Sequence, residues 1–258
     1  MRFVLEDLLS DYLPNMNNLS ITVEAYSDLE YMRWNSLLTK EPETIEWIRN
    51  FSANSTFIDI GANIGIYSLV ACLSKVSRVI SFEPFTSNFL SLMHNIRSNN
   101  LKNVFAFNCG ISDASTLVQF HGNCMKTGAA EFTYSKILDN NLSVCTLLPF
   151  SIFAQLLVDT SLFPLYIKID VDGAEMNVLK SLDSFLQQKR SISVLIESDL
   201  QNESEVENFF LSRGFSLDYY YEEFRPHSIT RRIKESGNTA RNHVFSNNMP
   251  DTLSSTFA

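Results

Sequence analysis

Short apolar runs alternate with longer amphipathic segments along most of this chain. The clearest runs cover residues 57–60, 78–83 and 165–170, and their length and β-branched content are typical of buried strands. Segments with the length and pattern of helices follow all three, over residues 66–73, 86–100 and 174–186. Strands that alternate with helices indicate a parallel sheet with right-handed crossovers. The pattern therefore predicts an α/β fold.

The remaining apolar segments extend this sheet. Further strands are predicted over residues 104–109, 193–197, 215–221 and 242–246, and further helices over 150–157 and 203–213. The last two strands would form a closing hairpin. A polar, β-rich excursion covers residues 116–146. We therefore predict a doubly wound, mostly parallel seven-stranded sheet with an antiparallel edge strand, in a Rossmann-like architecture.

Three regions are predicted along the chain. Residues 1–50 form an N-terminal helical extension, residues 51–246 the α/β domain, and residues 247–258 a polar C-terminal tail. In the extension, Glu41-Pro42-Glu43 is typical of a helix start, because acids and proline are favoured in the first turn. No linker separates the extension from the first strand, so we expect it to pack on the domain and to cover a bound cofactor.

Composition and charge narrow the function classes. The chain has 258 residues, enough for one α/β domain with a small appendage, and a formal net charge of −9. This acidic balance argues against a nucleic-acid binder, which would carry a basic stripe. Its four cysteines form no C-x-x-C pair, so neither a zinc site nor a disulfide framework is indicated. With no signal peptide or transmembrane segment visible, we expect a cytoplasmic protein.

The stretch TFIDIGANIGIYS, residues 56–68, combines a strand, a glycine turn and a helix start. Glycines allow positive φ and close approach of a ligand, and the following helix directs N–H groups into the same crevice. A nucleotide-like cofactor fits such a turn, although an ordinary strand-to-helix turn is the alternative. The spacing from Asp59 to Gly65 is D-x-G-x-N-x-G, which is not the G-x-G-x-x-G of dinucleotide sites. Glu83 ends the next strand, where a carboxylate accepts ribose hydroxyls.

Three blocks in order, FIDIGANIGIYSL, VISFEPFTSNFLSLMHNI and YIKIDVDGAEMNVLKSL, resemble the FkbM family of methyltransferases that depend on S-adenosylmethionine (SAM). The resemblance covers roughly residues 30–246 and implies the class I methyltransferase fold. The earlier segment RWNSLLTKEPETIEWI is similar to the one that precedes the first motif in bacterial members. One departure is Asp172, where the family usually has glutamate; it keeps the charge.

Carried over by position, the resemblance implies a set of cofactor-binding residues. These are Asp59, Gly61, Asn63, Gly65, Glu83, Pro84, Ser112, Asp113 and Asp170. Gly61, Asn63 and Gly65 would border the methionine part of SAM, and Glu83 would bind the ribose. Ser112 and Asp113 would contact adenine, and Asp170 would lie beside the sulfonium.

Methyl transfer to a hydroxyl needs alignment of the acceptor and a group that receives its proton. The candidates for this general base are Asp170 and Glu197, with Glu175 and His121 behind them. Asp170 could instead bind only the cofactor, and Glu197 could cap the turn that follows its strand. Asp170, Glu197 and Asp199 could also gather around a divalent ion, but the family pattern does not demand a metal and we predict none.

Lys168 interrupts an otherwise apolar central strand, and a buried lysine is costly unless it is paired. Its strand and that of Asp59 are neighbours in this fold, so we predict that Lys168 pairs with Asp59. Farther along, Arg225, Arg231, Arg232 and Lys234 form a basic cluster that either belongs to a solvated loop or recognises an acidic acceptor.

The sequence thus predicts a SAM-dependent methyltransferase that acts on oxygen. The resemblance implies a small-molecule or glycan acceptor, such as a sugar or another hydroxylated biosynthetic product, and N-methylation stays open. The alternative from another class is a catalytically inactive methyltransferase-like binding module in a biosynthetic assembly. A nicotinamide oxidoreductase is disfavoured by the glycine spacing.

Overall fold

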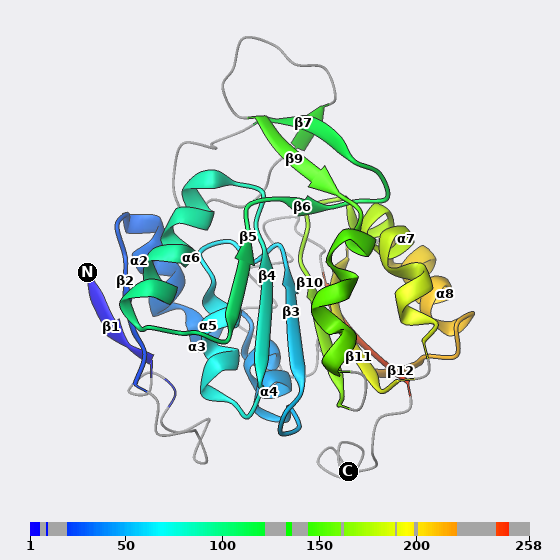
Figure 1. The fold of residues 1–258 in the computed structure, drawn as a ribbon, viewed down its shortest axis with the longest axis horizontal. Helices are drawn as coiled ribbons and strands as arrows, with labels where there is room; N and C mark the ends of the chain where they lie inside the picture. The colour runs from blue at the N-terminus through cyan, green and yellow to red at the C-terminus, as the bar shows by residue number, and fades with distance from the viewer. Residues whose placement is uncertain are drawn as a thin grey trace.

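The computed structural model describes residues 1–5, 9, 20–121, 133–135, 144–160, 163–188, 190–198, 201–220 and 241–247. Its centre is a seven-stranded sheet with the strand order β12-β13-β11-β10-β3-β4-β5 (Figure 1). In chain order these strands are β3 (Thr56–Ile60), β4 (Arg78–Phe82), β5 (Val104–Phe107), β10 (Leu165–Ile169), β11 (Ile192–Ser198), β12 (Ser216–Tyr220) and β13 (Arg241–Asn247). The predicted doubly wound α/β fold is confirmed.

One detail of the predicted sheet is wrong, namely the place of its antiparallel strand. This strand is β13, which pairs antiparallel with both β11 and β12, so it lies one position in from the edge. Strand β12 comes first along the chain and lies at the edge of the sheet. Strand β13 follows and lies between β12 and β11. The edge strand therefore runs in the same direction as the parallel strands.

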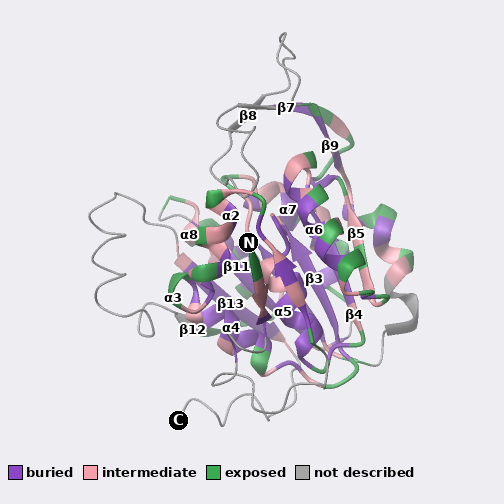
Figure 2. Cartoon of the chain, turned by 90° about the vertical axis from the view of Figure 1, so that its left-hand side faces the viewer, coloured by how far each residue is buried: buried purple, intermediate pink, exposed green. Residues whose placement is uncertain are grey.

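Alternating side chains along each strand supply two separate cores. In β3, Phe57 packs on one face with the N-terminal extension, whereas Ile58 and Ile60 pack on the other. Both β3 and β10 are buried along their whole length, and Figure 2 shows this for β3. The first face is covered by α4 (Pro42–Arg49), α5 (Ile66–Leu73) and α6 (Thr86–Ser98). The second is covered by η1 (Phe150–Thr160), α7 (Glu175–Leu186) and α8 (Glu203–Leu211). The domain thus has three layers.

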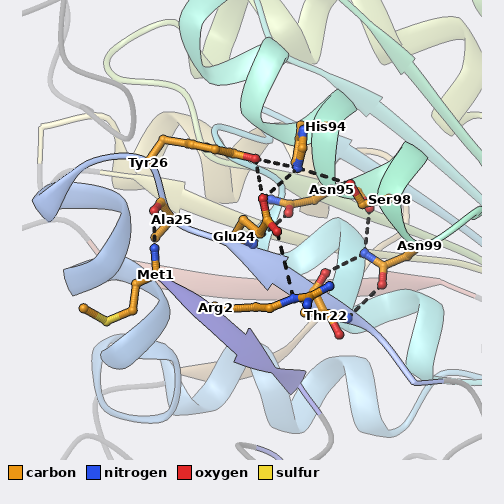
Figure 3. A network of polar contacts seen from close by, with 10 residues as sticks. All are labelled: Met1, Arg2, Thr22, Glu24, Ala25, Tyr26, His94, Asn95, Ser98 and Asn99. Atoms are coloured by element: carbon orange, nitrogen blue, oxygen red, sulfur yellow. Dashed lines mark hydrogen bonds and ion pairs between the residues drawn. The ribbon is translucent and has the colours of Figure 1, made fainter.

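The N-terminal extension contains the predicted helices and also a short β-ribbon. Strands β1 (Arg2–Val4) and β2 (Thr22–Glu24) pair antiparallel, and α2 (Asp28–Asn35) and α3 (Leu37–Lys40) precede α4. Polar contacts fasten the ribbon to α6 (Figure 3). Asn99 exchanges two hydrogen bonds with the backbone of Thr22, and Asn95 accepts one from the Glu24 amide. The extension therefore packs on the domain, as predicted, and leads into α4 over the sheet.

A second, smaller sheet stands above the carboxyl ends of the central strands (Figure 1). It consists of β6 (Gly110–Ile111), β7 (Thr116–His121), β8 (Thr133–Ser135) and β9 (Val144–Leu148), in the order β6-β9-β7-β8. The described part of the excursion is thus β-rich, as predicted. The apolar segment after it forms a 3-10 helix, η1, packed on α7.

Among the described residues, no helix has both the length and the apolar character needed to cross a membrane. Except for Asn247, which ends β13, the predicted tail lies outside the described residues. The basic cluster of Arg225 to Lys234 and the candidate ligand Asp199 lie outside them as well.

Candidate active site

The glycine turn between β3 and α5 has the backbone conformation that its sequence predicts. Gly61 and Gly65 have φ of 86° and 87°, and Asn63 between them has φ of 52°. The amides of Gly61 and Ala62 both donate to the carbonyl of Phe82 at 3.0 Å. The turn is therefore fixed against the end of β4.

Close packing also explains why Gly61 must be glycine. A Cβ added to Gly61 would lie 1.9 Å from the carbonyl oxygen of Asp170, and one on Gly65 would lie 2.3 Å from a methyl of Leu92. The turn thus touches the end of β10 directly. This contact places the first glycine and Asp170 side by side.

Glu83, the predicted ribose ligand, is hydrogen-bonded to the backbone of the glycine turn. Its two carboxylate oxygens accept from the amides of Asn63, at 2.7 Å, and Phe85, at 2.8 Å. Burial raises the pKa of Glu83 to about 7, despite these hydrogen bonds and one from Asn88. A carboxylate has about four acceptor positions, so hydrogen-bonding capacity remains for a hydroxyl group.

The other predicted cofactor residues border the same edge of the sheet. Pro84 follows Glu83 and lies 3.5 Å from where a Cβ on Gly110 would be. Ser112 is buried, its amide donates to the Leu148 carbonyl at 3.0 Å, and its hydroxyl donates to Asp113 at 3.2 Å. Asp113 itself is exposed. The small sheet thus holds Ser112 and Asp113 next to the carboxyl end of β4.

A row of polar side chains crosses the face of the sheet that the extension covers. Register places Ser81 of β4, Asp59 of β3 and Lys168 of β10 side by side. Asp59 accepts from the Ser68 hydroxyl at 2.6 Å, and Ser68 also contacts Ser81 at 2.7 Å. Among the described residues, no hydrogen-bond partner reaches the other oxygen of Asp59. The row therefore contains a buried acceptor atom beside the glycine turn.

The predicted pairing of Lys168 with Asp59 is wrong. The two residues are register partners, as expected, but the Lys168 ammonium donates to Asp170 at 2.6 Å. Residues two apart in a strand project to the same face, so Asp170 is the nearer partner although it lies just past the strand. Lys168 also lies 4.7 Å from the centre of the Tyr67 ring, an attractive cation–π arrangement.

Asp59 makes stability depend on pH. Burial raises its pKa to about 6 from 3.8, against the opposing effects of Lys168 and Ser68. An acid with a raised pKa in the folded state stabilises the fold while protonated, and this contribution is lost as the pH rises from about 4 to 6. We expect Asp59→Asn, which stays neutral, to be more stable than the native protein at pH 7 by on the order of 3 kcal/mol.

Urea unfolding at pH 4 and pH 7 measures this difference. Asp218→Asn, an exposed aspartate on β12, is the control and should leave the free energy of unfolding unchanged at both values. An equal free energy of unfolding for Asp59→Asn and the native protein at pH 7 would contradict the prediction.

Three carboxylates converge at the ends of β10 and β11. One oxygen each from Glu41, Asp170 and Glu197 lies within 4.8 Å of the others. Asp170 and Glu197 are half-buried and Glu41 is buried. Lys168 contacts Asp170 at 2.6 Å, and Lys40 contacts Glu41 at 3.0 Å. We call these five residues the carboxylate–lysine cluster.

The two candidate bases differ in their pKa. Burial alone would raise the pKa of Asp170, but Lys168 and Lys40 outweigh it and hold this pKa well below its usual value. The pKa of Glu197 is raised well above its usual value, first by burial and then by Asp170 and Glu41. Neighbouring carboxylates separate in this way because both cannot ionise easily. The structure thus brings both predicted bases together, and it makes Asp170 the stronger acid and Glu197 the stronger base.

Two members of the cluster, Glu41 and Lys40, are not among the residues that the sequence singles out for chemistry. Glu41 is the N-cap of α4, and its side chain makes no capping hydrogen bond. The available signal is glutamate at this position, because N-caps are usually Ser, Thr, Asp or Asn. A glutamate directly before Pro42 therefore indicates that its carboxylate serves something other than the helix.

The remaining candidate bases lie elsewhere. Glu175 accepts from the Gly173 amide at 2.9 Å and so stabilises the turn before α7. The backbone of His121 belongs to β7, and its side chain is outside the described residues.

The spacing of Glu41, Asp170 and Glu197 matches what oxygen ligands of a divalent cation require. Lys168 and Lys40 already face these carboxylates, however, and supply the positive charge that an ion would otherwise bring. We therefore treat the cluster as an ion-pair network and assign no metal to it.

Comparison with known proteins gives the family. A model of the family described as Vibrio cholerae RfbT protein matches residues 34–202. The chain belongs to this RfbT family. The match begins in the extension and ends after β11, so it includes the glycine turn and the whole carboxylate–lysine cluster.

One relative of this RfbT-family chain and one solved structure with a similar fold are methyltransferases by name. Methyltransferase 1 of Beauveria bassiana (strain ARSEF 2860) is 28% identical over 152 residues, which cover 52% of this chain and 60% of that protein. The crystal structure of methyltransferase FkbM from Methylobacillus flagellatus KT superposes with a TM-score of 0.51 at 17% identity. It covers 86% of this chain and 55% of that one. The expected likeness to FkbM is confirmed in the fold, and the chain spans less than two thirds of either relative.

The residues at this edge fit SAM. The turn offers positive-φ backbone, and Glu83 offers acceptor capacity to a ribose. Beside them, one buried oxygen of Asp59 accepts no hydrogen bond from any residue that the structure describes. The chain runs from β3 to β4 and β5 in one direction, and β10 lies on the other side of β3. Ligands of open α/β sheets bind at such a switch point. Gly61 and Asp170 meet there.

Proposed function

We propose that this chain is a SAM-dependent methyltransferase that transfers the methyl group to an oxygen of a sugar or another hydroxylated biosynthetic product. The observation that carries the proposal is the contact between Gly61 and Asp170, which joins the cofactor turn to the carboxylate–lysine cluster. SAM, when bound, supplies a methyl group on a positively charged sulfur. The family membership and the methyltransferase relatives support this proposal.

Glu83 would hold the ribose and the glycine turn the methionine part, while Ser112 and Asp113 would contact adenine. Asp170 is kept ionised by Lys168, so it is a poor base and serves as a fixed negative charge beside the methyl donor. Burial and the neighbouring carboxylates raise the pKa of Glu197 above its usual value, which makes Glu197 the stronger base of the two. Glu197 would therefore receive the proton of the acceptor hydroxyl.

Cofactor binding tests the proposal without knowledge of the acceptor. Isothermal titration calorimetry of the purified protein should show binding of SAM and of its product, S-adenosylhomocysteine (SAH), and none of NAD. Removal of an exposed contact to adenine, in Asp113→Ala, should weaken both by roughly 10- to 150-fold, because a hydrogen bond to a charged group contributes about 1.5–3 kcal/mol.

Asp218→Ala is the matched control. Asp218 is exposed and accepts from the Ser216 hydroxyl at 3.0 Å, much as Asp113 does from Ser112, but it lies on the edge strand β12. Its loss should leave SAM affinity unchanged. Binding of NAD in place of SAM would overturn the proposal, and SAM binding without turnover on any hydroxylated acceptor would favour the binding-module alternative.

A further inference from the structure

The N-terminal extension contributes a side chain to the candidate active site. Glu41 stands between α3 and α4 and is only 3% exposed. Its carboxylate contacts Lys40 at 3.0 Å and accepts from the Thr44 hydroxyl at 3.2 Å. From there the Glu41 carboxylate faces Asp170 and Glu197, which lie more than a hundred residues later in the chain. The extension is therefore part of the cluster as well as a cover for it.

The cluster contains one more acid than base. Glu41, Asp170 and Glu197 face the ammonium groups of Lys40 and Lys168. Three further groups act on the cluster: Arg33 acts on Lys40, the Tyr67 hydroxyl donates to Glu41, and Glu43 is buried two residues from Glu41. Arg33 and Glu43 carry opposite charges and leave the difference between acids and bases unchanged. With every group ionised, the cluster would carry one uncompensated negative charge in a half-buried place. One proton on a carboxylate makes it neutral, which is the cheaper state away from water.

Geometry places this proton on Glu197. Asp170 and Glu41 each have an ammonium group within 3.0 Å, whereas the salt bridges among the described residues include none to Glu197. On β13, the register partner of Glu197 is the neutral Asn242, and the neighbouring Arg241 and His243 face Glu203. Asp59 lies on β3, beyond β10. The raised pKa of Glu197 agrees with this assignment.

We propose that Glu41, Asp170 and Glu197 hold one proton between them, and that they release it to solvent when the site takes up the positive charge of SAM. This inference rests on the proposed function. Glu197 would lose its O–H bond as the cationic cofactor arrives, and so would become a base only when the methyl donor is present. When the methyl group has left, Glu197 would carry the acceptor proton and the sulfur would be neutral. The cluster would then be neutral again.

The test compares SAM with SAH, which differ in the charge at sulfur. Titration calorimetry in two buffers of different ionisation enthalpy counts the protons released on binding. Below pH 7 the amino group that both ligands share stays protonated. Below the pKa of Glu197 we expect release of about one proton with SAM and none with SAH. The affinity for SAM should rise by up to tenfold per pH unit, while that for SAH stays flat.

Three variants assign the proton. Glu197→Gln should abolish the release and make SAM binding independent of pH. Glu41→Gln leaves one carboxylate fewer, so the proton leaves Glu197 at lower pH and the release at a given pH is smaller. Glu46→Gln is the control, because Glu46 lies on the same helix but pairs with Arg49 at 3.1 Å. It should release as many protons as the native protein.

Each outcome decides the matter. Equal proton counts and pH slopes for SAM and SAH would overturn the inference and leave the proposed function intact. An effect of Glu46→Gln as large as that of Glu41→Gln would overturn the role given to Glu41. If SAM does not bind the native protein at any pH, the proposed function fails and this inference with it. Circular dichroism confirms that each variant is folded, and Glu41→Gln still tests the proposal if Glu197→Gln is not.

Discussion

Replacing Lys168 with methionine should lower the free energy of unfolding by about 3–5 kcal/mol at pH 7, because removal of one partner leaves buried charge uncompensated. Lys168 is 1% exposed and its ammonium lies 2.6 Å from Asp170. Burial alone would lower its pKa, but Asp170 and Glu41 outweigh burial and raise it. Urea unfolding monitored by circular dichroism measures the loss.

Acid should rescue this variant. Burial raises the pKa of Asp170, and without Lys168 only Lys40 and Glu197 oppose burial, so we expect part of the stability missing at pH 7 to return as the pH falls and Asp170 takes up a proton. Adding Asp170→Asn should recover part of the loss at pH 7 for the same reason. Lys180→Met, the same change at an exposed position on α7, should stay within about 0.5 kcal/mol of the native protein. Equal effects of the two methionine variants would refute the buried-charge explanation.

The choice of partner by Lys168 shows how far the sequence predicts this site. The pattern of strands predicts that Lys168 and Asp59 face each other across β10 and β3, and they do. It does not predict which carboxylate the ammonium reaches, because Asp170 lies on the same face two residues away and just outside the strand. The register of the two strands follows from their hydrophobic pattern. Which carboxylate pairs with Lys168 depends instead on the positions of the side-chain atoms in the folded protein.

Glu41 shows a different limit. It precedes Glu197 by most of the chain, and its contact depends on how the extension folds back over the sheet. The pattern EPET predicts a helix start, and α4 begins at Pro42 as expected. Nothing in the pattern predicts that the carboxylate of this N-cap residue makes no capping hydrogen bond and instead lies beside Asp170 and Glu197. The local sequence pattern therefore cannot predict that Glu41 reaches residues far away in the chain. The glycine turn is different, because its residue spacing predicts its backbone conformation.

The glycine turn offers the second large effect. Gly61→Ala should lower the free energy of unfolding by about 3 kcal/mol or more, and should weaken SAM binding as well. A methyl group at Gly61 would lie 1.9 Å from the Asp170 carbonyl oxygen, and backbone atoms on both sides must move to admit it. The positive φ of 86° adds about 1 kcal/mol of strain. Urea unfolding and SAM titration of the same preparation measure both losses.

Gly173→Ala separates strain from contact. Gly173 also has a positive φ, of 74°, but a Cβ there would meet no atom within 4 Å. This variant should therefore lose only about 1 kcal/mol, the cost of the backbone conformation. The difference between the two variants then measures the packing of Gly61 on Asp170. If Gly61→Ala loses no more than Gly173→Ala, the turn does not set the position of Asp170, and the link between the cofactor turn and the carboxylate–lysine cluster would have to lie elsewhere.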